Sequence, residues 1–482
     1  IAANTVAGFV QFVLRANYLN HKDFPYLPEA GYGALNQSDL AMRYFKWLEH
    51  SHPERTYQHA RSPYGEKVVS VHGKRYSVDC IEDDKKIIEI HGCYYHGCPT
   101  CYLPGQVLSG GETAATLYQR AKDRVGHLRT KYKVKVKWEC KIRKKIMGDP
   151  VMKKFFKDVK IYARLKPRDA LFGGRVEVFR PYLKASADME IKYYDIVSMY
   201  PYVQSSMSFP LGHPTVIVKD FLPIVGCKLP YKGLIMLRVL APRHLSLPLL
   251  PMKHADCLYF GNCAQCIYDE VQHCTHENEL DRAWVDTYCT VEIEKALGLG
   301  YRILEIIEVW TWDRFCDKVY KDYISNFMKL KYAASEYPSH VKSYDDKVEY
   351  LKMVSEDIGV TLTPEDIFVS APGRTVAKLG ANSGWGKHAE SPLHSKTEYL
   401  PLAEYFKLRL DASREITGLK ATSLDGLVIV THRPIKETVR ANRFSSVVHA
   451  AFVTSYARCL LYDVLSAAGS GLAYCDTDSV VF

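Results

Sequence analysis

Apolar positions recur with two different periods along the chain, which predicts a mixed α/β protein. Between residues 66 and 102 they recur at every second position, which is typical of β-strands separated by polar turns. Residues 114–132 are rich in alanine, lysine and arginine and predict a helix, and residues 134–138 alternate again as a strand. This part of the chain is therefore predicted to consist of strands, one helix and a further strand.

The second half of the chain continues the mixture of strands and helices. Strands are predicted from residue 170 onward, and a stretch rich in proline and cysteine follows at residues 200–290. Helices are predicted at 316–355, at 373–388 and at 445–468, where the last one runs into a strand at 472–482. Residues 1–60 predict two helices, and the break between them contains Pro25, Pro28, Gly31 and Gly33.

Composition places the chain among ordinary globular proteins. It has 482 residues, of which 47% are hydrophobic and 24% charged, and this excludes a disordered or fibrous protein. Lys and Arg exceed Asp and Glu by 64 to 54, so the net charge of +10 permits a polyanionic partner without requiring one. No apolar run reaches about 18 residues, and the first twenty residues carry no secretory signal. We therefore expect no membrane contact and an intracellular location, in the nucleus or the cytoplasm.

Two short segments each deliver aspartates to the end of an apolar or aromatic strand. One contains Asp195 and the other Asp476 and Asp478, which on an ideal strand point to the same face. Carboxylates on one face repel each other unless a cation lies between them, and carboxylate oxygens suit Mg²⁺. Two such ions can activate an attacking hydroxyl and stabilise a leaving group. The alternative for a lone Asp-x-Asp is a turn with solvated aspartates.

A third segment, residues 374–387, places basic side chains at helical spacing. Arg374, Lys378 and Asn382 lie at i, i+4 and i+8, so a helix puts them on one face. Two cations on such a face can hold a triphosphate, while Asn382 lies one turn further on. A solvated basic helix face is the alternative interpretation.

In order and type these three segments resemble motifs A, B and C of family B DNA polymerases. Motif A is matched from Asp195 to Pro201 with Met199 at a Leu position, and motif C is matched in full at residues 474–479. Motif B has Trp385 in place of Tyr, which resembles the protein-primed branch and, within it, the polymerases of Maverick/Polinton transposable elements. The run at residues 172–175 also resembles a glycine pair that this branch carries before the palm.

The resemblance implies a role for each matching residue. It implies two Mg²⁺ held mainly by Asp195 and Asp478 with support from Asp476, and a polymerase palm with helical fingers. The implied nucleotide-binding residues are Tyr200 as a steric gate against ribose, Arg374 and Lys378 as triphosphate clamps, Asn382 and Trp385. The implied DNA-binding residues are Gly173, Gly174, Arg175, Ser383 and Gly386. Gly384 departs from the family pattern and predicts a flexible point in the fingers helix. The implied partners are template and primer DNA, deoxynucleoside triphosphates and a terminal priming protein.

Cysteines and histidines cluster twice at short spacings, which favours zinc in a reducing compartment over disulfides. The first predicted tetrahedral set is Cys93, Cys98, Cys101 and Cys140, with Cys140 at the end of a strand, and His96 is an alternative fourth ligand. The second set is Cys263, Cys266, Cys274 and His276. For this second set, the alternatives are a zinc knot that only folds a loop, a priming or processivity insert, and free thiols in a core.

The surroundings of the first set resemble the very-short-patch-repair endonuclease fold, a relative of restriction enzymes. The resemblance implies that Asp79 binds Mg²⁺ and that His91 and His96 are active-site histidines, while Glu66 supplies a further acid. A zinc-stapled module without cleavage is the alternative interpretation.

Together these features predict an α/β (α+β) protein in which a small restriction-endonuclease-like module precedes a family B palm and fingers. The expected ranges are a helical segment at 1–60, the endonuclease-like zinc module at 61–145, the start of the palm at 146–205, a cysteine-bearing insertion at 206–315, fingers at 316–395 and palm at 396–482. The proofreading exonuclease and the thumb of the family are not found, so we expect a fragment. The expected function is DNA-directed DNA polymerisation, and the alternatives are an inactive DNA-binding remnant and a metal-dependent nuclease.

Overall fold

The computed structural model describes most of the chain, as two compact units. The described residues are 6–20, 23–26, 38–62, 65–255, 257–391, 393, 395–411, 413–434 and 445–482. The predicted break at Pro28, Gly31 and Gly33 lies outside them. One unit, here the palm unit, comprises residues 1–29, 166–215 and 222–482, and the other, the N-terminal unit, comprises residues 30–165 and 216–221. The segment predicted at 1–60 is therefore divided between the two.

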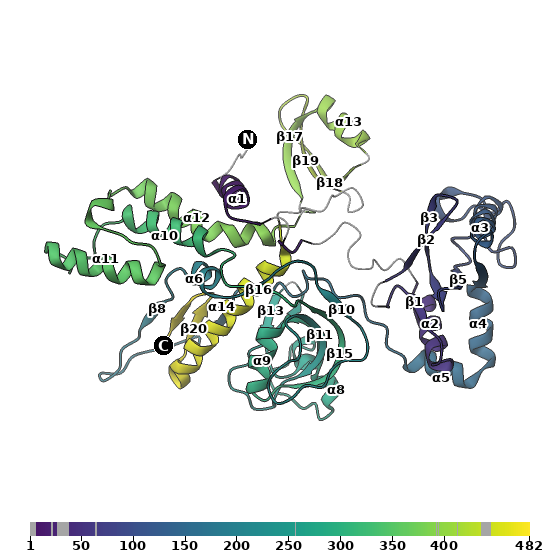
Figure 1. The fold of residues 1–482 in the computed structure, drawn as a ribbon, viewed down its shortest axis with the longest axis horizontal. Coiled ribbons are helices and arrows are strands. Elements are labelled where there is room, and N and C mark those ends of the chain that lie inside the picture. The colour runs from purple at the N-terminus through teal and green to yellow at the C-terminus, as the bar shows by residue number, and fades with distance from the viewer. Residues whose placement is uncertain are drawn as a thin grey trace. The chain divides into compact units, whose positions relative to one another are not determined.

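The N-terminal unit is built on a four-stranded sheet in the order β1-β4-β5-β6 (Figure 1). Its strands are β1 (Tyr57–His59), β4 (Cys80–Glu82), β5 (Lys86–His91) and β6 (Lys133–Trp138). The neighbours β5 and β6 are parallel, and α3 (Ala114–Arg129) connects them, as a parallel pair requires. The predicted helix and strand at 114–138 are thus confirmed.

Apolar side chains cover both faces of this sheet. On one face Ile88 and Ile90 pack with α2 (Asp39–Ser51), α4 (Glu139–Gly148) and α5 (Pro150–Asp158). On the other face Ile87 packs with Leu128 of α3 and with a hairpin of β2 (Lys67–Val71) and β3 (Lys74–Val78). The alternating pattern of β5 therefore has a structural reason, because successive residues enter different cores.

The palm unit contains an antiparallel sheet in the order β7-β20-β21-β8. Its strands are β7 (Val176–Val178), β20 (Tyr474–Asp476), β21 (Ser479–Val481) and β8 (Tyr193–Asp195). The long helix α14 (Val447–Ala468) packs against it through Leu461 and Leu465, which contact the buried Cys475 and Val480. The strand predicted at 472–482 is in fact two strands joined at Thr477, whose φ of 54° makes a tight turn.

A second group of strands lies in the segment between the two aspartate motifs. The antiparallel order is β15 (Arg302–Thr311), β11 (Gly233–Leu240) and β14 (Trp284–Cys289), and α9 (Thr290–Gly298) follows β14. The shorter elements are β9 (Phe209–Pro210), β10 (Thr215–Ile217), β12 (Pro251–His254), β13 (Cys257–Phe260), α7 (Ala264–Tyr268), α8 (Glu279–Arg282) and β16 (Phe315–Cys316).

The palm unit also contains several helices besides α9 and α14 (Figure 1). They are α1 (Val6–Asn17), α6 (Met199–Ser206), α10 (Lys321–Ala333), α11 (Tyr344–Ile358) and α12 (Ala371–Ala389). A small sheet of β17 (Lys396–Pro401), β19 (Leu427–Pro434) and β18 (Arg414–Ala421) follows, with α13 (Leu402–Leu410). The described helices include none long and apolar enough to cross a membrane.

Two glycines let α12 approach its neighbours closely. A Cβ at Gly380 would lie 2.2 Å from the ring of Phe327, and one at Gly384 would lie 3.3 Å from Tyr323. The Tyr323 hydroxyl also donates a hydrogen bond of 2.6 Å to the Gly380 carbonyl. Gly384 is therefore buried in a helix contact, and the flexible point expected there stays a prediction.

Candidate functional site

Strand pairing in the palm sheet brings the two aspartate motifs together. Asp476 and Asp195 both pair with Ser479, Asp476 from β20 and Asp195 from β8. Directly paired residues point to one side of a sheet, so the motifs share a face although 281 positions separate them in the sequence. Asp478 occupies the intervening turn, and its carbonyl accepts a 2.7 Å hydrogen bond from the Ile196 N–H.

Electrostatics link the three carboxylates. Desolvation raises the pKa of Asp478, and the charges of Asp195 and, to a smaller extent, Asp476 raise it further. Both of these neighbours are exposed. Within the described residues the three do not form a group whose oxygens all lie within 4.8 Å of one another, since Asp476 lies two strands from Asp195. The charge of Asp195 acts on Asp478 more strongly than that of Asp476, and these two are the predicted principal Mg²⁺ ligands. An uncompensated pair of this kind is a donor set that fits a divalent cation.

The glycine pair supports the turn between Asp476 and Asp478. A Cβ at Gly174 would lie 2.6 Å from the Thr477 hydroxyl, and the Thr477 N–H donates to the Arg175 carbonyl at 2.8 Å. The Arg175 side chain is buried and bound to Glu177 and to the Pro248 carbonyl. Its guanidinium is enclosed by protein, and a contact between this side chain and DNA stays a prediction.

A buried ion pair supports the segment that contains the glycine pair. Arg458 of α14 contacts Glu292 of α9 at 2.7 Å, and both side chains are almost fully buried. The Arg458 guanidinium also donates to the carbonyls of Phe172 and Gly173, each at 3.0 Å. Breaking a buried pair leaves an uncompensated charge, so this contact fixes the glycine turn firmly.

Cations from two helices face the carboxylates. Arg374 and Lys378 lie one turn apart on α12 and are exposed, and the Lys378 charge acts on Asp478. Lys331 of α10 is only 8% exposed, and its ammonium donates a 3.0 Å hydrogen bond to the Ser198 hydroxyl of motif A. Burial lowers the pKa of Lys331, and the charges of Arg374 and Lys378 lower it further. Positive charges that are gathered in this way form a binding site for an anion.

The motif A tyrosine lies against the fingers helix. The rings of Tyr200 and Trp385 are 4.7 Å apart at 36°, and burial raises the pKa of the tyrosine to about 12. Tyr200 is therefore neutral near pH 7 and closes one side of the space beside the carboxylates. Asn382, Ser383 and Gly386 are partly exposed on the same helix.

The first predicted cysteine set converges in the N-terminal unit. Cys93, Cys98, Cys101 and Cys140 have sulfur atoms within 4.8 Å of one another. Cys140 lies in the first turn of α4 and does not end a strand, because β6 stops at Trp138. The neighbouring Glu139 accepts a 3.1 Å hydrogen bond from the Cys93 N–H, which ties α4 to the cysteine loop. Four thiols at this spacing fit tetrahedral zinc.

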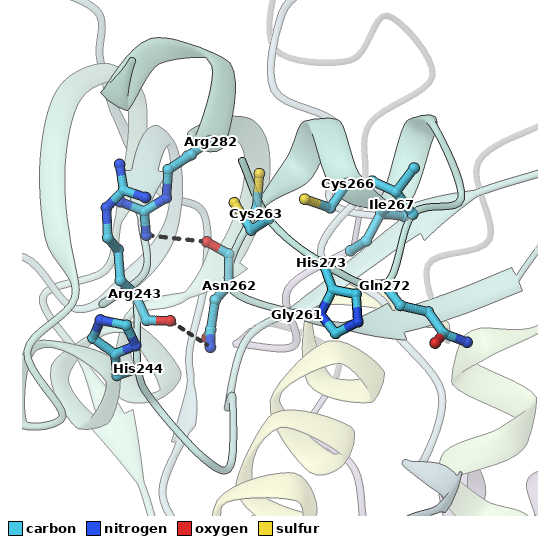
Figure 2. Close-up of a pocket in the computed structure, with 12 residues that line it drawn as sticks. Arg243, His244, Gly261, Asn262, Cys263, Cys266, Ile267, Gln272, His273 and Arg282 are labelled. Atoms are coloured by element: carbon cyan, nitrogen blue, oxygen red, sulfur yellow. Dashed lines mark hydrogen bonds between the residues drawn. The ribbon is translucent and has the colours of Figure 1, made fainter. Parts of the chain in front are cut away.

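The second predicted set also converges. The Nδ1 atom of His276 lies 3.5 Å from the sulfur of Cys263, 3.4 Å from Cys266 and 3.9 Å from Cys274. Desolvation raises the pKa of Cys274, but His276 and the two other thiols lower it to about 7. Figure 2 shows Cys263 and Cys266 in a pocket with Arg282, whose guanidinium donates to the Asn262 carbonyl. Cys257 does not belong to the group.

The residues of the endonuclease-like prediction lie near each other in the N-terminal unit. Asp79 accepts a 2.7 Å hydrogen bond from the Ile90 N–H, and burial together with the charges of Glu89 and Glu66 raises its pKa to about 7. The rings of His91 and His96 stack 4.5 Å apart. Burial, followed by the charges of His96 and Arg124, lowers the pKa of His91 to about 4.

Two further observations concern the histidines and Asp79. His91 Nδ1 is buried and has no hydrogen-bond partner among the described residues. His96 and Asp79 both lie outside the four-thiol group, as predicted. The buried Glu89, the half-buried Asp79 and the imidazole of His91 fit a divalent cation and a general base.

Sequence reasoning missed four of these residues. Lys331 lies on the same helix face as the buried Ile324 and Met328. A lysine on an apolar helix face is the sequence signal that could have identified it. Glu89 stands two residues before His91 on the same face of β5, which the strand period could have revealed. Arg458 and Glu292 are 166 positions apart, and no local pattern joins them.

Comparisons with known proteins agree with the motifs over part of the chain. Residues 142–344, less than half of the sequence, match the family described as DNA polymerase type B, organellar and viral. The match includes motif A and the second cysteine set, while motifs B and C lie beyond it. No curated protein matches the chain significantly.

Among solved structures, three of phi29 DNA polymerase are similar at 18% identity. They are the ternary complex with primer-template DNA and incoming nucleotide, the binary complex with primer-template DNA and an orthorhombic crystal form, with TM-scores of 0.38, 0.39 and 0.36. The alignments cover 70–71% of this chain but only 47% of the phage polymerase.

Elemental analysis of the purified chain should return two zinc ions. Cys140→Ser and Cys274→Ser should each lose one ion, because each removes a ligand from a different tetrahedral set. Since metal binding contributes folding free energy, each variant should also open its own region to proteolysis. Cys257→Ser is the matched control and should keep both ions. No bound zinc, or loss of zinc in the control alone, would contradict the two sets.

Proposed function

We propose that the chain is a DNA-directed DNA polymerase of the protein-primed family B type. The observation that carries this proposal is the pairing of β8 with β21, which sets Asp195 beside Asp478 in front of a cluster of cations. The match of residues 142–344 to a type B polymerase family supports it independently. The reaction is transfer of a nucleotide from a deoxynucleoside triphosphate to a primer hydroxyl on a DNA template.

The arrangement divides the work between opposite charges. Asp195 and Asp478, with Asp476 in support, would hold two Mg²⁺, and such ions would supply activation of the attacking hydroxyl and neutralisation of the leaving pyrophosphate. Arg374, Lys378 and the buried Lys331 grip the triphosphate, so its charge is balanced before the reaction begins. The hydrogen bond from Lys331 to Ser198 keeps this cation directed at motif A.

Aromatic and small residues select the other parts of the substrate. Tyr200, packed against Trp385, lies under the sugar and excludes a ribose hydroxyl by its bulk. Asn382 contacts the incoming base, while Ser383, Gly386 and the backbone of Gly173 and Gly174 approach the DNA. In this proposal Arg175 serves the DNA only indirectly, through the turn that it holds.

The finer identity and the remaining partners also belong to this proposal. The motif pattern, with Trp385 and Lys387 after Asn382, favours a polymerase of Maverick/Polinton elements. A terminal protein would then supply the priming hydroxyl, and the cysteine-bearing segment at 206–315 is the region that would contact it. The second zinc site would stabilise that segment.

Primer extension on a DNA template with Mg²⁺ tests the proposal. The chain should extend a primer, and Asp478→Asn should lower the rate at least about a hundredfold because it removes a metal-holding charge from the reacting centre. The control Asp188→Asn, an exposed aspartate on the same unit, should retain the parental rate. DNA binding without extension by any of the three proteins would instead favour a binding-only remnant.

A second candidate function, cleavage of DNA by the N-terminal unit, is favoured by the unpartnered Nδ1 of His91, which lies on the same face of β5 as the buried Glu89, and by the half-buried Asp79. In this proposal Asp79 and Glu89 hold a divalent cation, with Glu66 nearby, and His91 or His96 accepts a proton from the attacking water. The ordinary alternative is a zinc-stapled module that only folds.

Nicking of supercoiled plasmid in the presence of Mg²⁺ separates these alternatives. Asp79→Asn should abolish nicking and keep both zinc ions and full primer extension, since it touches neither the thiols nor the palm. Asp478→Asn should show the reverse pattern. Nicking that survives Asp79→Asn, or that no preparation shows, would exclude a nuclease at this site.

A further inference from the structure

Most of the net positive charge of the chain is concentrated in one short segment of the N-terminal unit. Residues 131–148 contain eight lysines and arginines and one glutamate, while the whole chain has an excess of only ten basic residues. The segment forms β6 and α4, and β6 is the edge strand of its sheet. Its charge is therefore presented at a border that no other strand of the sheet covers.

The fold gathers lysines from three elements at this border. Lys135 and Lys137 are two apart on β6, so they point to one face at a spacing of about 6.6 Å. They pair with Ile88 and Ile90 of β5, which pack on the α4 side of the sheet. Lys141 and Lys145 lie one turn apart on α4, and Lys86 belongs to β5. We call these residues the lysine surface: Lys86, Lys135, Lys137, Lys141 and Lys145.

Repulsion between these lysines is not neutralised within the unit. Burial lowers the pKa of Lys137, and the charges of Lys135, Lys145, Lys86 and Lys141 lower it further, so the other four all act on Lys137. Glu82 contacts Lys86 at 2.6 Å and shares its carboxylate with Arg55. Across the described residues, the other four lysines form no ion pair within 4.0 Å. Lys135, Lys141 and Lys145 are exposed.

The surface is also held rigid. Ile142 of α4 is buried in the core beneath it, and Cys140 in the same helix belongs to the first cysteine set. The Glu139 contact to the cysteine loop fixes the start of the helix. The backbone positions of these lysines are therefore fixed, which lowers the entropy that is lost when an extended anion binds.

We propose that the lysine surface binds the sugar–phosphate backbone of a nucleic acid. A row of cations about 6 Å apart complements a linear polyanion, and the release of counterions from such a backbone supplies affinity without base recognition. Edge-strand lysines also protect a sheet from aggregation, but this does not explain Lys141 and Lys145, which lie on a helix. Glu89 and His91 are on the opposite face of β5, so this contact is separate from the nuclease candidate.

A matched pair of triple variants of the full chain tests the proposal. K135Q/K141Q/K145Q should weaken binding to a 20-base-pair duplex at least tenfold at moderate salt, and should reduce the slope of log affinity against log salt by about 2 to 3. K74Q/K85Q/K122Q removes the same charge from exposed lysines elsewhere in the unit and should keep the parental slope. Equal effects of the two triples would overturn the proposal.

Lysine acetylation with mass spectrometry gives a second measurement on the unmodified chain. Duplex or single-stranded DNA should protect Lys141 and Lys145 but leave Lys74 reactive, and the two kinds of DNA show which backbone is preferred. Protection by poly-glutamate and not by DNA would assign the surface to an acidic protein and overturn the proposal. Primer extension at saturating DNA should be unchanged in K135Q/K141Q/K145Q, so this test does not depend on the polymerase proposal.

Discussion

Repulsion between carboxylates is the constraint on which the palm unit depends. The fold pairs two strands that begin 286 positions apart and leaves Asp195 next to the turn of Asp478, although the Asp195 charge makes Asp478 harder to ionise. Such an arrangement is unfavourable unless positive charge is supplied, and Lys378 of α12 supplies part of it. Cations between the aspartates complete the balance.

The turn that carries this charge is held by contacts of a different kind. Gly174 allows the chain to approach Thr477, and the buried Arg458 binds the carbonyls in front of that glycine. Glu292 neutralises Arg458, so the support is a closed network inside the core. The backbone that carries the exposed aspartates is therefore anchored to the core of the palm unit.

Much of the architecture could be predicted from the sequence because its signals are local. The alternation of β5 and β6, the helical spacing of Arg374 and Lys378, and the cysteine spacings all describe neighbours within one element or loop. The sequence signals are insufficient where contacts between segments far apart in the sequence determine the structure. Thr477 bends an apparent strand, Gly384 fits against Tyr323, and the Arg175 guanidinium turns inward to Glu177. Lys331 joins the site only through tertiary packing, so its role could not be derived from motif spacing.

The central claim is that Asp195 and Asp478 jointly hold divalent cations, and binding of Mn²⁺ followed by electron paramagnetic resonance tests it most directly. In an Asp79→Asn background, which removes the other candidate site, Mn²⁺ should bind in the presence of a deoxynucleoside triphosphate. Either Asp195→Asn or Asp478→Asn should weaken that binding by about tenfold or more, since each removes a charged ligand. Unchanged Mn²⁺ affinity in both variants would contradict the claim.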